Sequence, residues 1–176
     1  MEFRLEQSIE ILERTPAVLD GLLRGLSREW VRGDEGPGTW SPFDVLGHLI
    51  HGERTDWIPR LHILLDYGEE RPFDPFDRFG MFRESKDKTL DELLQVFAEL
   101  RRTNLRELRS LNLTEDLLGR YGAHPELGRV TLGQLIATWA AHDLDHLCQI
   151  ARVMARQYAI ATGPWAAYIG AITRPL

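Results

Sequence analysis

The sequence has one cysteine, no long apolar run and no block of like charge, and each of these absences excludes a class of protein. Cys148 is the only cysteine, so no internal disulfide can form and a reducing, cytoplasmic compartment is expected. No segment approaches the ~20 apolar residues that span a bilayer. The charged N-terminal residues do not match a secretory signal either. We therefore expect a protein with no membrane contact.

The charge balance argues against nucleic acid as a partner. Lys and Arg number 21 against 27 Asp and Glu, which gives a net charge of -6. Proteins bind nucleic acid largely by neutralising phosphates with Lys and Arg. No nucleic-acid partner is therefore expected.

The composition is that of a globular domain with few strands. Hydrophobic residues make up 43% of the chain and charged residues 27%, which is typical of globular rather than disordered proteins. Strict alternation of apolar and polar residues is absent, so few or no strands are expected. A length of 176 residues suits about one domain, and we expect residues 1–176 to form a single one.

In the first half of the chain, apolar residues at helical spacing are divided by helix-start signals. Residues 3–14 are expected to form a helix that is interrupted just before Pro16, where a second helical segment starts. Ser41 is followed by proline and an acid, which predicts an N-cap. The helix from Ser41 is expected to reach about Tyr67, with Pro59 kinking it or splitting it in two.

In the second half, Thr89 and Thr131 are expected to cap long helices that reach about Leu111 and Tyr158. The arginines of the helix after Thr89 are expected to form an ion-paired surface. The loop 68–88 carries four phenylalanines, which either pin it to the body or line a ligand site. The predicted fold class is all-α, a four-helix bundle with long connections and short accessory helices.

Two histidines have a spacing that suits a metal site. His142 and His146 lie four apart in the longest predicted helix, so both rings project from one face. The same stripe is expected to face inward and holds Leu135, Thr138, Trp139, Gln149 and Val153. An unpaired buried polar group costs roughly 1–3 kcal/mol, so buried imidazoles need partners. A divalent metal ion would be one, because i, i+4 spacing gives two ligands from one helix.

A third ligand would come from the helix after Ser41. His48 and His51 lie three apart there, and Glu53 turns away from both. The apolar face of this helix lies nearly opposite His48. Either His48 faces a separate cleft, or His51 is the better inward ligand, and spacing alone leaves both open.

Other polar residues have simpler interpretations. His62 and His124 are expected to be ordinary surface or loop residues, and Cys148 a small buried apolar group. Asp143 and Asp145 flank the histidine pair. A hydrogen bond to a ligand imidazole is one role for them, and a solvated or arginine-paired acid is the other.

Three motifs resemble the DinB-like family of four-helix-bundle proteins. They are Gly-Thr-Trp40-Ser41-Pro42 before a helix, Gly47-His48-Leu49 within it, and His142-Asp-Leu-Asp-His146-Leu-Cys-Gln149-Ile150 late in the chain. The resemblance implies that His48, His142 and His146 form a divalent-metal site for nickel, zinc or a similar ion, with water in the open positions. It also implies a homodimer. Some members of the family are thiol-dependent transferases or isomerases that use a low-molecular-weight thiol such as bacillithiol or mycothiol.

Three hypotheses for function follow. The first is a metal-dependent enzyme, a thiol transferase or a small-molecule hydrolase, since three ligands with an open position suit Lewis-acid catalysis. No catalytic residue is assigned, and His51 and Asp145 are candidate general bases by position only. The second is a non-catalytic dimeric module that binds a ligand or partner and keeps a vestigial metal site. The third, a structural metal site, needs four protein ligands, and the sequence offers no fourth.

Overall fold

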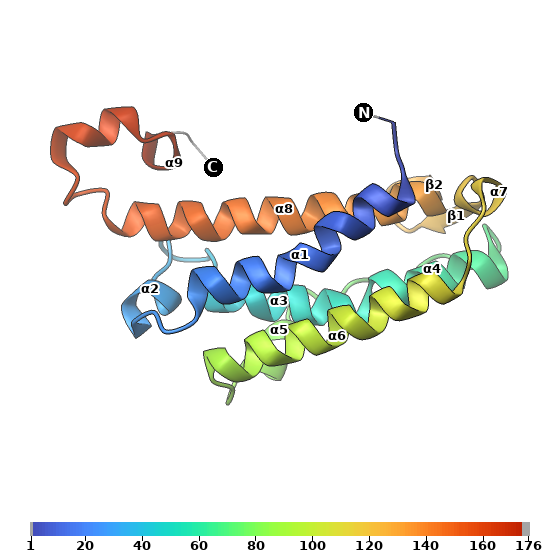
Figure 1. Cartoon of the computed structure of the whole chain (residues 1–176), viewed down its shortest axis with the longest axis horizontal. Coiled ribbons are helices and arrows are strands. Elements are labelled where there is room, and N and C mark those ends of the chain that lie inside the picture. The colour runs from blue at the N-terminus through green and yellow to red at the C-terminus, as the bar shows by residue number, and fades with distance from the viewer. Residues whose placement is uncertain (1, 174–176) are drawn as a thin grey trace.

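The computed structural model describes residues 2–173 and is a four-helix bundle (Figure 1). The predicted fold class is confirmed. The long helices are α1 (Leu5–Leu23), α3 (Pro42–Thr55) with its continuation α4 (Trp57–Tyr67), α6 (Leu90–Ser110) and α8 (Leu132–Gln157). None of the described helices is long and apolar enough to cross a membrane.

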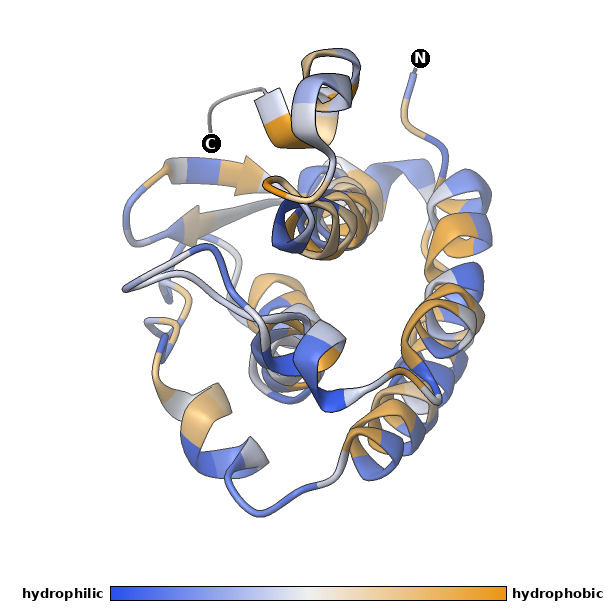
Figure 2. Cartoon of the chain, turned by 90° about the vertical axis from the view of Figure 1, so that its left-hand side faces the viewer, coloured by the Kyte–Doolittle hydropathy of each residue, from blue (hydrophilic) through white to orange (hydrophobic). Residues whose placement is uncertain are grey.

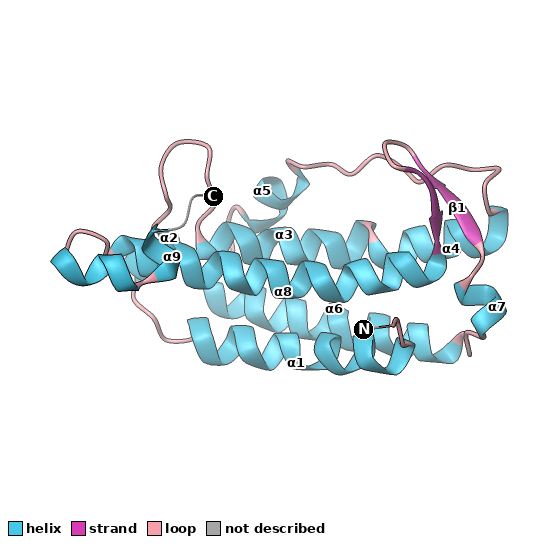
Figure 3. Cartoon of the chain, turned by 90° about the horizontal axis from the view of Figure 1, so that it is seen from above, coloured by secondary structure: helices cyan, strands magenta, loops and turns pink. Residues whose placement is uncertain are grey.

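Short elements connect the long helices (Figure 3). They are α2 (Arg28–Arg32), α5 (Gly80–Ser85), α7 (Glu115–Leu118), a 3₁₀ helix (Gly163–Tyr168) and α9 (Gly170–Thr173). The strands β1 (Tyr121–His124) and β2 (Gly128–Thr131) form an antiparallel hairpin in which Tyr121 pairs with Thr131. This hairpin occupies part of the connection between α7 and α8.

The N-terminal caps of three long helices form as predicted. Ser41, Thr89 and Thr131 each accept a hydrogen bond from the backbone N–H three residues on. In return, each cap residue's backbone N–H donates to the side chain of that third residue. These acceptors are Asp44, Glu92 and Gln134. Reciprocal bonding of this kind satisfies two helix-end donors at once, so the starts of α3, α6 and α8 are fixed locally.

Two proline predictions need correction. α1 runs through Pro16, where an interruption was predicted. Pro16 has no N–H for the carbonyl of Leu12, but the Arg101 side chain donates to that carbonyl at 2.9 Å, so the helix continues. The helix that was expected to reach Tyr67 does split, but at Asp56 and not at Pro59. Pro59 lies in the first turn of α4, where backbone N–H groups lack helical acceptors anyway.

The helices do not simply alternate in direction. α3, α4 and α6 run the same way along the bundle, whereas α1 and α8 run the opposite way (Figure 1). The segment between α4 and α6 therefore returns along the bundle, and it brings α5 against α3. This return places parts of the long loop beside α3, where the functional site lies.

The core consists of two apolar clusters with polar residues between them. The helices turn their apolar faces inward (Figure 2), as burial of apolar surface requires. One cluster includes Leu12, Trp57, Leu105 and Trp139, and the other includes Leu19, Leu46, Phe97 and Ile150. Between them along the four long helices lie four buried polar residues, Thr15, Glu53, Arg101 and Asp143. We call these four residues the polar layer.

Candidate metal centre

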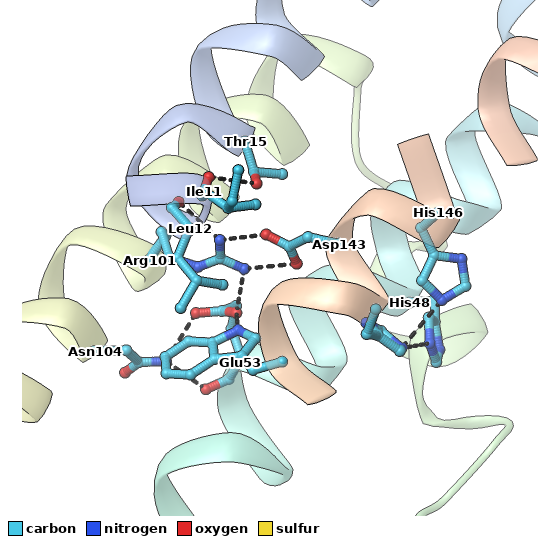
Figure 4. A network of polar contacts seen from close by, with 11 residues as sticks. Ile11, Leu12, Thr15, His48, Glu53, Arg101, Asn104, Asp143 and His146 are labelled. Atoms are coloured by element: carbon cyan, nitrogen blue, oxygen red, sulfur yellow. Dashed lines mark hydrogen bonds and ion pairs between the residues drawn. The ribbon is translucent and has the colours of Figure 1, made fainter. Parts of the chain in front are cut away.

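Three histidine rings from two helices converge beside the polar layer. His48 lies on α3, and His142 and His146 lie on α8. The Nε2 atom of His142 is 3.1 Å from Nε2 of His48 and 3.1 Å from Nε2 of His146. One ring nitrogen from each histidine lies within 4.8 Å of the other two. Figure 4 shows His48 and His146 facing each other across the two helices. We call the three residues the histidine cluster.

The structure places His48 beside His142 and His146 and His51 outside this group. His48 is half-buried and faces the loop after α4, where Phe76 packs edge-on to its ring at 5.5 Å. His51 is buried outside the cluster, and its Nδ1 lies 2.8 Å from Oε1 of Glu84. The residue before His48 is Gly47, and a Cβ there would approach Oγ of Ser85 to 2.6 Å. The absence of a side chain at Gly47 therefore lets α5 pack close to α3.

Aromatic rings surround the histidine cluster. The Trp40 ring lies 4.9 Å from that of His48 and 6.3 Å from that of His146, and the Trp57 ring lies 5.1 Å from that of His142. These rings limit the access of water to the imidazoles. Trp40 comes directly before the capping residue of α3, so the same local segment starts the helix and covers the cluster.

A hydrogen bond fixes the protonation pattern of His146. Nδ1 of His146 lies 2.7 Å from Oε1 of Gln149, an amide oxygen that can only accept. Nδ1 therefore carries the hydrogen, and Nε2 presents its lone pair to the cluster. Orientation of a ligand imidazole by a hydrogen bond to its other nitrogen is the usual arrangement at metal sites.

The three imidazoles are neutral at neutral pH. Burial, together with the smaller effect of neighbouring imidazoles, lowers the pKa of His48 to about 4 and that of His142 to about 3. Burial also lowers the pKa of His146. Because a metal ion needs the neutral ring, these shifts keep the nitrogens available as ligands.

The donor set fits a divalent metal ion. Two nitrogens bound at about 2.0–2.1 Å to one ion, at tetrahedral to right angles, are about 2.8–3.4 Å apart. The two separations that involve Nε2 of His142 are 3.1 Å. Among residues 2–173, the group of side chains placed to share an ion contains these three histidines and no fourth. Three protein ligands leave open positions, which is the pattern of catalytic rather than structural sites.

A cavity of about 360 Å³ adjoins the histidine cluster, a volume within the usual range of small-molecule sites. His48 and His142 line it, and Trp57 and Phe76 contribute apolar wall. The other walls come from α4, the loop after it and the β1–β2 hairpin. Its charged and polar lining includes Asp56, Arg60, Arg78 and His124. None of these four was singled out as functional from the sequence, since three lie outside any recognisable motif and His124 was taken as an ordinary residue.

The prediction that the arginines of α6 form an ion-paired surface is wrong for Arg101. Its side chain is 1% exposed and lies at the centre of the polar layer (Figure 4). Its guanidinium donates to both carboxylate oxygens of Asp143, at 2.5 and 3.0 Å, and to Oε1 of Glu53 at 2.7 Å. The signal was present in the sequence, because Arg101 is four residues from both Phe97 and Leu105 and so shares the apolar stripe of α6.

Glu53 is satisfied by further donors. Nε1 of Trp139 donates to its Oε1 at 2.9 Å, and the amide of Asn104 donates to its Oε2 at 3.0 Å. Asp143 points from α8 toward Arg101, while His146 points toward His48 (Figure 4). Asp143 is therefore the arginine-paired acid of the two predicted alternatives. The polar layer joins α3 to α8, the two helices that carry the histidine cluster.

The remaining sequence predictions had mixed outcomes. His62 is half-exposed and paired with Glu107, as an ordinary surface residue. Asp145 is exposed and does not line the cavity. Cys148 and Thr138 are also exposed, so the predictions of a buried thiol and an inward-facing threonine were wrong. Both lie on the side of α8 that no other long helix covers.

The bundle and the histidine cluster together define a class of helical protein with a three-histidine site able to hold a metal ion. The model of the DinB superfamily matches residues 11–150. The chain belongs to the DinB superfamily.

Two solved structures share the fold. YfiT from Bacillus subtilis, described as a probable metal-dependent hydrolase with an unusual four-helix bundle topology, aligns with a TM-score of 0.73 and 24% identity, over 87% of this chain and 86% of its own. TT2238, described as a four-helix bundle protein, aligns with a TM-score of 0.51 and 21% identity, over 82% of this chain and 98% of its own. A search of the curated proteins found no match.

Proposed function

We propose that His48, His142 and His146 bind a divalent metal ion and that the protein is a metal-dependent enzyme acting on a small molecule. The observation that carries this proposal is the convergence of three neutral imidazoles beside a cavity that two of them line. The description of YfiT as a probable metal-dependent hydrolase supports it. Zinc, nickel and similar ions all accept three imidazoles.

The chemistry divides between the ion and the chain. When bound, a divalent ion supplies a Lewis acid that lowers the pKa of a water or thiol at an open position. Gln149 holds His146 with its Nε2 lone pair facing the cluster. Trp40 and Phe76 pack against the ring of His48 and limit its movement. The cavity then holds the substrate against His48 and His142.

Metal analysis of untagged protein tests the first step. We expect about one equivalent of divalent metal per chain, and its loss in His48→Ala, His142→Ala and His146→Ala. The surface variant His62→Ala should keep the metal, and so should His51→Ala, because His51 pairs with Glu84 outside the cluster. Wild-type protein that takes up no divalent metal at any stage would overturn the proposal.

Two reaction classes suit such a centre, and one assay for each separates them. Hydrolysis is supported by the description of YfiT, and thiol transfer by the family resemblance. Metal-loaded protein would be given p-nitrophenyl esters alone, and in parallel an electrophile such as 1-chloro-2,4-dinitrobenzene with a low-molecular-weight thiol. Turnover of either that is lost in His142→Ala assigns the class.

The second candidate function is a non-catalytic dimeric binding module, favoured by exposed apolar residues near the C-terminus. Ile160, Trp165 and Tyr168 are all exposed, and such surface often marks an interface. A homodimer is the proposed assembly in both candidates, and light scattering over a range of concentrations tests it. Ligand binding that persists in His146→Ala would favour the module. A cytoplasmic location is proposed as well, because a reducing compartment suits the exposed thiol of Cys148.

A further inference from the structure

The cavity beside the histidine cluster has a second end with different chemistry. Arg60 lies on α4, twelve residues beyond His48. The Arg60 guanidinium lies 5.4 Å from the centre of the Phe73 ring, and the His124 ring lies 6.1 Å from the same ring. Arg60 and His124 therefore both lie beside Phe73, which belongs to the loop after α4 and not to the histidine cluster. Both line the cavity, together with Arg78 from the loop after α4.

All three of these residues present N–H donors. Nδ1 of His124 accepts from the backbone N–H groups of Glu126 and Leu127, both at 3.1 Å. In the neutral ring the hydrogen therefore sits on Nε2, which becomes a donor. Arg78 is exposed and forms no ion pair with any residue of the described part of the chain. Guanidinium groups match the two oxygens of a carboxylate with paired hydrogen bonds.

Two acids, Asp56 and Glu126, also line this cavity, and their positions decide whether they neutralise the arginines. Oδ1 of Asp56 lies 2.5 Å from Nε of Arg60, so this carboxylate is committed to the arginine and fixes its orientation. Glu126 is exposed at the hairpin. Neither acid is paired with Arg78, whose charge stays available to a ligand. The acids could also attract a cation, so the test below includes one.

We propose that the cavity binds a small organic carboxylate, with its carboxylate group held by Arg60, Arg78 and His124. Its hydrocarbon part lies against Trp57 and Phe76. The rest of the ligand faces His48 and His142 and would be the part that reacts. Only this statement about the reacting part rests on the proposed function. The cavity thus orients its ligand by charge at one end and presents it to the histidine cluster at the other.

Three probes of one shape test the proposal on the full chain freed of metal with a chelator. They are 4-phenylbutyrate, 4-phenylbutyramide and 4-phenylbutylamine, with affinities measured by calorimetry. We expect the carboxylate to bind about tenfold or more tightly than the amide, as charge-assisted hydrogen bonds require, and the amine to bind most weakly. Equal binding of all three, tighter binding of the amine, or no binding of the carboxylate at millimolar concentration overturns the proposal.

Matched variants assign the preference to residues. Arg78→Gln should lose most of the preference for the carboxylate, whereas Arg71→Gln should keep it, because Arg71 pairs with Asp74 and does not line the cavity. Arg60→Gln leaves Asp56 unpaired, so the double variant Arg60→Gln/Asp56→Asn replaces it if the single variant is unstable. A preference unchanged in both the Arg78 and the Arg60 variants overturns the proposal.

Metal-loaded protein separates this inference from the proposed function. If the carboxylate binds only after metal is added, the ion holds it, and the arginine subsite is wrong while the metal-dependent function stands. If the preference is present without metal and no metal ever binds, the subsite stands and the proposed function fails.

Discussion

Arg101 donates from Nη1 to the carbonyl oxygen of Leu12 at 2.9 Å. Pro16 has no N–H and cannot donate to this carbonyl within α1. A proline inside a helix removes the hydrogen bond to the carbonyl four residues earlier. The same guanidinium binds Asp143 and Glu53. One side chain on α6 thus contacts α1, α3 and α8. Its guanidinium both bonds the carbonyl that Pro16 leaves without a helical donor and joins α6 to α3 and α8 by ion pairs.

We expect Arg101→Met to destabilise the protein strongly. Glu53 and Asp143 would remain buried without their cation, and removal of one partner from a buried ion pair costs about 3–5 kcal/mol. Arg102→Met is the control, because Arg102 is exposed and pairs only with Glu99 at the surface, where such pairs contribute about 0–1 kcal/mol. Urea denaturation of the metal-free proteins measures both.

A compensated variant keeps this prediction testable if Arg101→Met does not fold. Arg101→Met/Glu53→Gln/Asp143→Asn removes the buried charges together and should recover part of the lost stability. Equal stability of Arg101→Met and Arg102→Met would show that the polar layer does not hold the helices together.

Gln149→Leu should weaken metal binding without unfolding the protein. The Gln149 side chain is half-buried and its oxygen accepts from Nδ1 of His146, and removal of such a partner typically lowers metal affinity about 10–100-fold. Gln95→Leu, at an exposed position of α6, should bind metal as the wild type does. Competition with a chromogenic chelator measures the affinities, and the same affinity in both variants would contradict the assigned role of Gln149.

Acid should destabilise the metal-free protein through the histidine cluster. The pKa of His48 falls from 6.5 to about 4 on folding, and that of His142 to about 3, chiefly through burial. Between pH 6.5 and about 4 the unfolded chain therefore holds protons that the folded chain does not, so stability falls as the pH drops through this window and is unaffected above it. The expected slope is about 1 kcal/mol per pH unit for each ring.

The free energy of unfolding in urea, measured with a chelator across this pH range, checks the slope. His48→Gln and His142→Gln should each flatten it, because each removes a ring whose pKa falls on folding. Parallel curves for wild type and His142→Gln would mean that the cluster does not titrate as inferred.

Two glycine substitutions should have opposite effects on stability. A Cβ at Gly80 would collide with the imidazole of His51, and such overpacking costs about 1–3 kcal/mol. A Cβ at Gly21, inside α1, meets no atom within 4 Å, so Gly21→Ala should stabilise the protein by about 0.5–1 kcal/mol. Thermal melts of Gly80→Ala and Gly21→Ala test this pair, and a Gly80→Ala protein as stable as wild type would contradict the tight contact.

Local signals made the helices predictable, but contacts between helices were not. Capping residues such as Ser41 and Thr131 act within a few residues, so the starts of α3 and α8 follow from sequence alone. Pro16 was misread because its missing hydrogen bond is replaced from α6, 85 positions later in the chain. Cys148 was misread because spacing gives the face of a helix but not which faces a neighbour covers.

The histidine cluster was predictable only in part. The spacing of His142 and His146 placed them on one face of α8. The helical wheel of α3 did not show whether His48 or His51 is the third ligand. The family resemblance named His48, and the structure shows why the wheel was ambiguous. His48 faces a cleft formed by the loop after α4, whose path no local pattern encodes.

His48 and His142 are 94 positions apart in the chain. An ion held between them would therefore act as a removable cross-link that closes the segment containing α4, α5, α6, α7 and the β1–β2 hairpin. Such a link cannot form until the ends of that long segment have met, so it would leave the rate of folding almost unchanged. It would instead slow the unfolding rate, and the lifetime of the native bundle would then depend on how much metal is available to it.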